Sequence, residues 1–410
     1  CSLRSIRRLL QDWRSLITIK RPLGHITALL FAGLFMACGN LGTPASPDTA
    51  QGSAYPNICQ TENSFIMIWY EGDNQIVMSE YTAEGWMPKD TIVSSERFFK
   101  NWADLPQIYH GGGDTLAVSW LEMSGEGTYD YDVHVAMSTD RGVSWSAPVV
   151  PHRDGIKGEH GFVSFFDFLG ETGLIWLDAR AMMAGGYGNG SGAMRLYASS
   201  INPAGELGLE IMLDNMVCEC CPTAAVNTSV GPLVAYRDRS HDETRNIQMA
   251  FTNGAQVPYT LHDDGWVVPG CPVNGPAMSA AGNNVAIAWY TAPDNNPQVN
   301  VAFSNDAGRT FGNPLRLDGG SAIGRTDLLW IDAENVLVSW LKEGKETGIL
   351  EMKTVNIATG EIKQLKALTL NPGRGSGYPK LALIEGFVFV AWTEPGEDGK
   401  VFSDWIPYKS

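Results

Sequence analysis

The chain has 410 residues, of which 44% are hydrophobic and 18% charged, so it is long enough and apolar enough for a large globular core. Its formal net charge of −16 argues against binding nucleic acid or anionic lipid through bulk charge, so an anionic ligand would need a local cluster of arginines. The 45 glycines and 22 prolines favour a turn-rich, all-β protein, and a β-propeller could use the whole length as one domain.

The N-terminal segment has the features of an export leader. Six basic residues precede an apolar run over 26–37 that is too short to span a bilayer. The run ends in Leu34-Phe35-Met36-Ala37-Cys38, which resembles a bacterial lipoprotein signal with Cys38 as the lipidated residue. We therefore expect residues 1–37 to be a signal segment, residues 38–54 a flexible tether and the protein a cell-envelope lipoprotein. Plain secretion and an uncleaved anchor are the alternatives.

A short strand that ends in an aromatic residue recurs along the remainder of the chain. The aromatic positions of the seven copies are Trp69, Trp120, Trp176, Tyr236, Trp289, Trp340 and Trp392. Their spacing of about 50 to 60 residues is that of propeller blades. We predict one β-propeller domain over residues 55–410, with four antiparallel strands in each blade and seven blades. The last repeat ends after Trp405, so we expect an N-terminal segment to cover its outer edge.

Two octapeptides follow predicted third strands at comparable places in their repeats. Residues 138–145 read Ser-Thr-Asp-Arg-Gly-Val-Ser-Trp, and residues 304–311 read Ser-Asn-Asp-Ala-Gly-Arg-Thr-Phe. Both resemble the Asp box (BNR repeat) of the sialidase (neuraminidase) superfamily, Ser-x-Asp-x-Gly-x-Thr-Trp, with Ser144 and Phe311 as the departures. The resemblance implies a sialidase-like β-propeller, for which six blades, the family's number, is the alternative to the seven counted.

Ionisable residues gather at one predicted face of the propeller. In a meander blade the start of the first strand and the end of the second lie on the same side of the ring, around the axis. This face would carry acids such as Asp104, Glu159, Asp178 and Asp327 together with several arginines. A polar funnel mouth of this kind is the default ligand site.

The resemblance to sialidases implies roles for these residues. Sialidases use a Tyr nucleophile assisted by Glu, an Asp acid/base and three arginines that bind the sugar carboxylate. The catalytic candidates here are Asp104, Asp178, Asp238, Glu243, Asp327 and the possible nucleophile Tyr378, and the substrate-binding candidates are Arg180, Arg237, Arg239, Arg325, Arg374 and His160. The family's first arginine is absent, because Ala103-Asp104-Leu105-Pro106 occupies its place.

These candidates lead to one main hypothesis and one alternative. We expect an exo-glycosidase that recognises an acidic sugar on a glycan or glycoconjugate. It would work as a monomer and without a cofactor. The alternative is a non-catalytic propeller that binds carbohydrate or protein. In that case the arginines would pair with acidic neighbours such as Asp238, Asp242 and Glu243 as rim salt bridges.

The cysteines support a third hypothesis. Cys218, Cys220 and Cys221 open one predicted inner strand and Cys271 opens the next, with His160 on an earlier blade. We expect a disulfide between Cys221 and Cys271, on adjacent blades. A thiolate and imidazole metal site, or a redox-active thiol, is the alternative interpretation.

Overall fold

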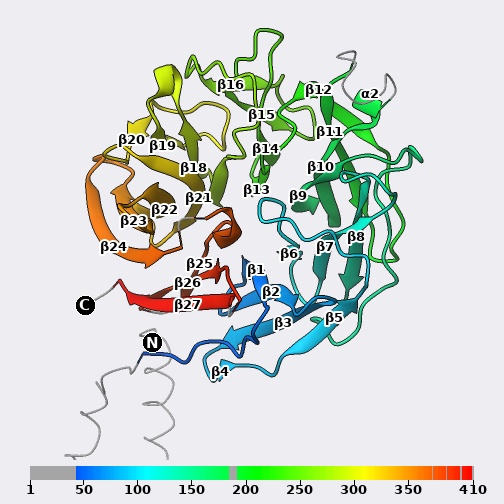
Figure 1. The fold of residues 1–410 in the computed structure, drawn as a ribbon. Helices are drawn as coiled ribbons and strands as arrows, with labels where there is room; N and C mark the ends of the chain where they lie inside the picture. The colour runs from blue at the N-terminus through cyan, green and yellow to red at the C-terminus, as the bar shows by residue number, and fades with distance from the viewer. Residues whose placement is uncertain (1–42, 184–191, 372, 385, 398, 409–410) are drawn as a thin grey trace, which may run out of the picture. The chain divides into compact units, whose positions relative to one another are not determined.

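The computed structural model describes residues 43–183, 192–371, 373–384, 386–397 and 399–408. The unit from Ala45 to Ser410 is an all-β propeller whose seven sheets surround a central axis (Figure 1). The predicted leader and its lipidation site, Cys38, lie outside the described residues. In the part of the chain that the structure describes, no helix is both long and apolar enough to cross a membrane.

The blades are antiparallel meanders that follow one another in chain order, and each adds its strands outward from the axis. Their strands are β1 (Ala54–Gln60), β2 (Phe65–Glu71), β3 (Gln75–Thr82), β4 (Gly85–Trp86) and β5 (Asp90–Ser94); β6 (Gln107–His110), β7 (Leu116–Met123) and β8 (Tyr131–Ser138); β9 (His160–Phe168), β10 (Glu171–Asp178), β11 (Met194–Ile201) and β12 (Ile211–Val217); β13 (Ala224–Thr228), β14 (Gly231–Arg237), β15 (Ile247–Phe251) and β16 (Tyr259–His262); β17 (Ala277–Ala281), β18 (Asn284–Thr291), β19 (Gln298–Ser304) and β20 (Leu315–Arg316); β21 (Ala322–Trp330), β22 (Asn335–Glu343), β23 (Gly348–Asn356) and β24 (Ile362–Leu370); and β25 (Lys380–Ile384), β26 (Phe387–Glu394) and β27 (Lys400–Pro407). Helix α2 (Arg180–Met183) and the 3-10 turns η2 (Pro293–Asn295) and η3 (Arg374–Ser376) interrupt this pattern. The count of seven blades is confirmed, and the six-bladed alternative is wrong.

The repeated aromatic residues form the interior of the blades. All seven are buried, and each lies near the end of a second strand, β2, β7, β10, β14, β18, β22 or β26. Seven apolar clusters lie between neighbouring blades. One of them joins Phe65 and Trp69 of the first blade to Phe389 and Trp405 of the last and so closes the ring. Burial of these large side chains is the main force that holds separate meanders in one ring.

The outer edge of the last blade is covered by the segment just before β1, as the sequence analysis expects. Thr49 donates through Oγ1 to the Val401 carbonyl at 2.9 Å, and the Gly52 amide donates to the Gly399 carbonyl at 2.7 Å. The Trp405 indole donates to the Ala45 carbonyl at 3.1 Å. The segment before β1 therefore covers the start of β27, where the Val401 amide also donates to Ser53 Oγ at 2.9 Å, and it limits the open length of this sheet edge.

The two octapeptides fold into the same hydrogen-bonded turn. In the first, Asp140 Oδ1 accepts from Ser138 Oγ at 2.8 Å and from the Ser144 amide at 2.9 Å. Asp306 does the same with Ser304 at 2.7 Å and Thr310 at 2.9 Å. Each turn has a glycine at positive φ, which a side chain would strain. Because both turns follow third strands, β8 and β19, the aspartates serve the scaffold.

Candidate functional site

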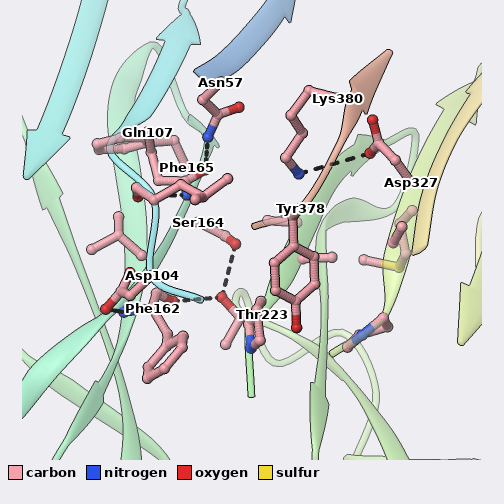
Figure 2. Close-up of a pocket in the computed structure, with 18 of the residues that line it drawn as sticks. Asn57, Asp104, Gln107, Phe162, Ser164, Phe165, Thr223, Asp327, Tyr378 and Lys380 are labelled. Atoms are coloured by element: carbon pink, nitrogen blue, oxygen red, sulfur yellow. Dashed lines mark hydrogen bonds and ion pairs between the residues drawn. The ribbon is translucent and has the colours of Figure 1, made fainter. Parts of the chain in front are cut away.

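The inner strands surround an axial cavity of about 280 Å³ (Figure 2). It is lined by residues of β1, β6, β9, β13, β17, β21 and β25, and three catalytic candidates, Asp104, Asp327 and Tyr378, lie in its wall. The structure thus brings these three residues to the axis, as the strand argument predicts. Their hydrogen bonds show what they do there.

Asp104 and Asp327 link each blade to the next one. Asp104 Oδ2 accepts from the Phe162 amide of β9 at 2.7 Å, and Asp327 Oδ2 accepts from the Leu381 amide of β25 at 2.8 Å. Asn274 Oδ1 accepts from the Arg325 amide of β21 in the same way, at 2.7 Å, whereas Asn57 donates through Nδ2 to the Pro106 carbonyl just before β6, at 2.8 Å. Burial raises the pKa of Asp104 to about 8 and raises that of Asp327 as well. Because the same contact recurs around the axis, it holds the blades in register.

Tyr378 lacks the surroundings of a phenolate nucleophile. Its hydroxyl donates to the Val273 carbonyl at 2.7 Å, and its side chain is buried. Burial raises its pKa well above the ordinary value, with the neighbouring Cys221 and Cys220 adding to the effect. Without a carboxylate to accept its proton, the Tyr–Glu pair that the resemblance implies is not assembled at this position.

The acids at the second-strand ends serve the repeated tryptophans. The indole N–H donates to the acid two residues later in four blades, at 2.7 to 2.9 Å, through the pairs Trp69–Glu71, Trp120–Glu122, Trp176–Asp178 and Trp392–Glu394. A buried indole N–H needs an acceptor. Asp178, a catalytic candidate, is therefore first of all the acceptor of Trp176.

Asp178 also belongs to a buried charge cluster between the second and third blades, formed by Asp132, His152, Asp154, His160, Asp178 and Arg180. Arg180 Nη2 lies 2.6 Å from Asp178 Oδ2, and Arg180 Nε lies 3.0 Å from Asp154 Oδ2. His160 Nε2 lies 3.1 Å from Asp154 Oδ2. His160 and Asp178 are fully buried, so neither they nor the inward-facing part of Arg180 can contact a sugar as predicted.

The electrostatics of this cluster stabilise a charged histidine. Burial alone would lower the pKa of His160, but hydrogen bonds to Asp132 and Asp154 and the charge of Asp178 outweigh it and raise the pKa to about 9. The ring of His152 stacks on that of His160, with centroids 3.6 Å apart and planes 2° from parallel. The side-chain ligand atoms of Asp132, His152 and His160 lie within 4.8 Å of one another.

Two further arginines of the predicted clamp are used inside the protein. Arg237 is fully buried and donates to the carbonyls of Asn274, Arg245 and Tyr290 at 2.6 to 2.8 Å. Arg325 donates to the Gly377 carbonyl at 3.1 Å and lies over the Trp102 ring. All three donor nitrogens of Arg237, and Nη1 of Arg325, thus bind backbone carbonyls, so both arginines have a structural role, and their binding of substrate stays a prediction. Asp238 is partly buried, accepts from Gln248 at 3.2 Å and does not line a pocket described below.

A second cavity, of about 560 Å³, opens beside the axis and is called the mouth pocket below. Of the candidates, it contains Arg239, Glu243 and Arg374. Other residues that line it are Trp102, Tyr129, Glu159, Glu219, Arg245, Cys220 and Cys271. The mouth pocket therefore combines aromatic surface, both signs of charge and two thiols, which is the composition of a polar ligand site.

Four residues form an ion-pair group in its wall, called the mouth cluster. Arg239 pairs with Glu219 and with Glu243, the latter at 2.6 Å. Arg245 lies 3.1 Å from Glu219 and 2.7 Å from Glu243. The hydrogen bond from Arg239 lowers the pKa of Glu243, so this carboxylate is ionised at neutral pH. The rim salt bridges expected as the alternative for Arg239 are therefore present, but they face the pocket.

Glu159 differs from the acids of the mouth cluster. It lies just before β9 and its side chain is buried. Its Oε1 atom accepts a hydrogen bond from the Tyr131 hydroxyl at 2.7 Å. Burial raises its pKa to about 7, and the charge of Glu219 adds to the rise. At neutral pH a large share of this group is therefore protonated, in the same pocket as the ionised Glu243. Opposite pKa shifts of neighbouring acids are the usual arrangement for one proton donor and one base.

Arg374 places a cation at the mouth pocket that none of the ion pairs of the described residues includes. It belongs to η3, and its guanidinium lies 5.9 Å from the centre of the Trp102 ring. Among the described residues, no carboxylate forms an ion pair with it. Arg325 holds the same turn through the Gly373 and Gly377 carbonyls, at 3.3 and 3.1 Å. Arg325 thus positions Arg374 and Trp102 at the mouth.

The cysteines lie together, but not in the predicted pairs. All five cysteines of the described residues are free thiols, so the expected disulfide between Cys221 and Cys271 is not formed. Cys221 instead faces Cys218, with the sulfur atoms 3.2 Å apart, and Cys220 faces Cys271. His160 belongs to the buried charge cluster and is not part of this group.

The sequence analysis overlooked several residues of the mouth pocket. Glu159 appeared only as one acid among many, although it precedes a first strand and a histidine. Glu219 lies between two cysteines, and its position in that loop was the available signal. Trp102 and Arg245 gave no signal, because their roles depend on residues of other blades that pack against them.

Comparisons with known proteins identify the fold. No family model and no curated protein matches the chain. Among solved structures, an ulvan lyase of polysaccharide lyase family PL25 is 9% identical, with 88% of this chain and 94% of that one covered and a TM-score of 0.55. The polysaccharide lyase Uly1 is 11% identical, with coverages of 93% and 96% and a TM-score of 0.54. The Hadza microbial sialidase Hz136 is 12% identical, with coverages of 83% and 73% and a TM-score of 0.50. The propeller fold is thus shared with sialidases and with polysaccharide lyases.

Proposed function

We propose that the protein acts on glycans at the mouth pocket, as an exo-glycosidase that recognises an acidic sugar. The observation that carries this proposal is the presence, in one pocket, of Glu159 with a raised pKa and of Arg374 without an ion-pair partner among the described residues. The fold, which glycan-acting enzymes share, is consistent with it, but a fold alone does not define an activity.

The mouth pocket offers each interaction that such a substrate needs. The guanidinium of Arg374 can bind a sugar carboxylate through two parallel hydrogen bonds. The Trp102 ring gives an apolar surface for a sugar face. Glu159 can protonate the leaving oxygen, while Glu243 or Glu219 provides a carboxylate for the second step of hydrolysis. This assignment replaces the Tyr nucleophile with a carboxylate, because the Tyr378 hydroxyl is bonded to a carbonyl.

The proposal is tested by hydrolysis of aryl glycosides of sialic acid, glucuronic acid and neutral sugars. Glu159→Gln should lower kcat by about 10² to 10⁴, the usual contribution of a general acid. Since this group must be protonated to act, kcat/KM should fall as pH rises through about 7. Glu343→Gln is the matched control, because Glu343 is an exposed residue at the end of β22 and does not line the mouth pocket. A product with a new carbon–carbon double bond would contradict hydrolysis and assign an elimination.

A second candidate function is non-catalytic binding of an acidic glycan. The observation that favours it is that Arg180, Arg237, Arg325 and Tyr378 are all engaged within the protein, so the catalytic pattern implied by the sialidase resemblance is incomplete. Calorimetric binding of a sialylated or uronic oligosaccharide, without turnover and weakened at least about tenfold by Arg374→Gln, would select this function. Absence of both binding and turnover would contradict both candidates.

We also propose that the protein is exported and held in the cell envelope by a lipid on Cys38. The support is the sequence of the leader, with its basic start and short apolar run. Labelling of cells with a fatty-acid probe should mark the wild-type chain, and Cys38→Ser should abolish the label and release the protein from the membrane fraction. Equal labelling of both chains would contradict the proposal.

A further inference from the structure

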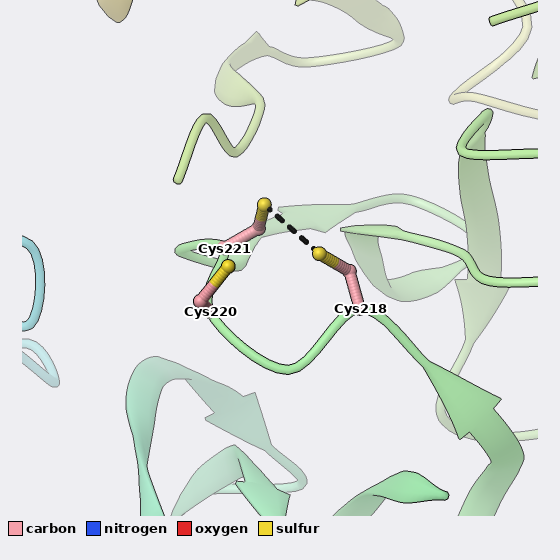
Figure 3. A group of neighbouring side chains, drawn as sticks. All are labelled: Cys218, Cys220 and Cys221. Carbon is pink, nitrogen blue, oxygen red and sulfur yellow. Dashed lines mark hydrogen bonds between the residues drawn. The ribbon is translucent and has the colours of Figure 1, made fainter. Parts of the chain in front are cut away.

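Three cysteine thiols meet in the loop that joins the third blade to the fourth. Cys218, Cys220 and Cys221 lie between β12 and β13, and their sulfur atoms are all within 4.8 Å of one another (Figure 3). Cys218 and Cys221 are buried, while Cys220 is partly exposed. A loop of four residues that directs three sulfur atoms to one point has an unusual local geometry, because neighbouring side chains normally diverge.

A fourth thiol approaches from the next blade. Cys271 lies in the connection between β16 and β17, and its thiol is a hydrogen-bonding neighbour of Cys220. Cys220 and Cys271 both line the mouth pocket. These four cysteines are called the thiol cluster below. Cys218 and Cys221 are its buried side, and Cys271 is its solvent-exposed side.

A hydrogen-bond donor and a buried cation lie beside the thiol cluster. The Asn274 backbone amide donates to the Cys221 sulfur at 3.3 Å. The Arg245 guanidinium is close enough to interact electrostatically with Cys218. Arg245 is 2% exposed, and its Nε atom has no hydrogen-bond acceptor among the described residues. A backbone N–H donor and a buried cation both stabilise thiolates, which are the form that binds metal.

We propose that the thiol cluster is a binding site for a thiophilic d¹⁰ metal ion, Zn²⁺ or Cu⁺. Thiolates are the preferred ligands of both ions. With metal–sulfur bonds of about 2.3 Å, tetrahedral ligands are roughly 3.8 Å apart. Sulfur atoms that already lie within 4.8 Å of one another reach this spacing with small side-chain rotations.

Two disulfides, Cys218–Cys221 and Cys220–Cys271, are the competing arrangement. Disulfides are neutral, so they would gain nothing from the Asn274 amide or from the charge of Arg245. A metal thiolate centre carries net negative charge and uses both groups. This proposal does not depend on the proposed glycan activity, since none of its ligands has a role in hydrolysis.

The experiment measures metal binding by the reduced protein. The chain is purified with a reductant, which is then removed without oxygen, and is titrated with Zn²⁺ or Cu⁺ against a coloured chelator of each ion. We expect one ion per chain, with a sulfur-to-metal absorption band in the ultraviolet. Cys218→Ser and Cys220→Ser should each weaken binding at least about tenfold, the lower end of what loss of a supporting group alone costs.

Cys59→Ser is the matched control, because it removes one thiol on the first blade, far from the cluster in sequence. It should bind the ion as the wild type does. Cys271→Ser distinguishes the two ions: loss of Zn²⁺ binding indicates four ligands, whereas unchanged Cu⁺ binding indicates the three cysteines of the loop. Should Cys218→Ser fail to fold, Cys220→Ser carries the test, since that side chain is partly exposed.

Two results would overturn the proposal. The first is metal uptake that is equal in Cys218→Ser, Cys220→Ser and Cys59→Ser, because the cluster would then hold no ion. The second is a thiol count showing that four cysteines reoxidise into two disulfides in the presence of excess Zn²⁺ or Cu⁺, because a bound ion would protect them.

Discussion

The buried charge cluster and the mouth cluster look alike in sequence and differ in structure. Both combine acids with arginines near the start of an inner strand. In the first, Asp178 and His160 are fully buried and every charge is met by another charge of the same group. In the second, the side chains of Arg239 and Glu243 stay about one quarter exposed and face a cavity. Ion pairs connect the blades in one place and border a cavity in the other.

The two clusters differ because the ion-pair partners of Arg180 are more deeply buried than those of Arg239. The Arg180 guanidinium lies 4.0 Å from the centre of the Tyr197 ring and reaches Asp154 and Glu210 in the connections before β9 and β12. Arg239 reaches only acids of its own blade and of the loop that enters it. Removal of one partner from a buried ion pair leaves an uncompensated charge, whereas an exposed pair is replaced by water. Three substitutions test this contrast.

The largest effect is expected for Asp178→Asn. It removes the fully buried one of the carboxylates that face Arg180 and His160, which keep Asp154 as a partner, so the free energy of unfolding should fall by about 3 to 5 kcal/mol. Urea denaturation followed by tryptophan fluorescence measures it. Glu122→Gln is the control, because Glu122 also accepts from a tryptophan, at 2.9 Å, but is partly exposed. It should cost about 1 kcal/mol. Equal losses would show that the buried cluster adds no stability.

The next effect concerns pH. The pKa of His160 is raised from an unfolded value of about 6.5 to about 9, so the folded state binds this proton more tightly. Its contribution is complete below pH of about 6.5 and is lost as pH rises toward about 9, which amounts to roughly 3 kcal/mol. Urea titrations across this range should show a steeper decline for the wild type than for His160→Gln.

The matched control for this measurement is His262→Gln, because His262 is exposed at the end of β16. Its decline with pH should follow that of the wild type. If His160→Gln declined just as steeply between pH 6.5 and 9, other groups would be responsible. Glu159 and Asp104, whose pKa values burial raises to about 7 and about 8, also lose protons in this range and set the remaining slope.

The smallest effect on stability is expected for Arg239→Gln in the mouth cluster. Its ion pairs are partly exposed, so the free energy of unfolding should change by no more than about 1 kcal/mol. Ligand binding should suffer instead, since Arg239 lines the mouth pocket. Parallel urea and calorimetric titrations of this variant check both parts. A loss of several kcal/mol would mean that the mouth cluster is structural, like the buried one.

The fold was predictable because its signal is repeated. Each blade carries its own strands and its own aromatic residue, and seven copies outweigh the ambiguity of any one strand. The two octapeptides were predictable because the aspartate hydrogen bonds that form the turn lie within eight residues.

The candidate site was only partly predictable. The strand argument placed Arg237 and Arg239 at one face, and both lie there. Arg237, however, meets carbonyls of Asn274 and Tyr290, while Arg239 faces the mouth pocket. Two arginines only two positions apart thus have different surroundings, and two of the partners that bury Arg237, Asn274 and Tyr290, are 37 and 53 positions away. Glu159 was not chosen as a catalytic candidate from the sequence, because its raised pKa arises from burial, and no local sequence pattern indicates that burial.

The sequence by itself determined the seven-bladed ring and its local turns, since the strand period, the repeated aromatics and the turn residues act over short distances. Only the tertiary structure decided which charges are consumed as links between blades and which remain open to a ligand. The physical reason is that desolvation and hydrogen-bond satisfaction depend on partners supplied by neighbouring blades, and these partners meet only when the ring closes.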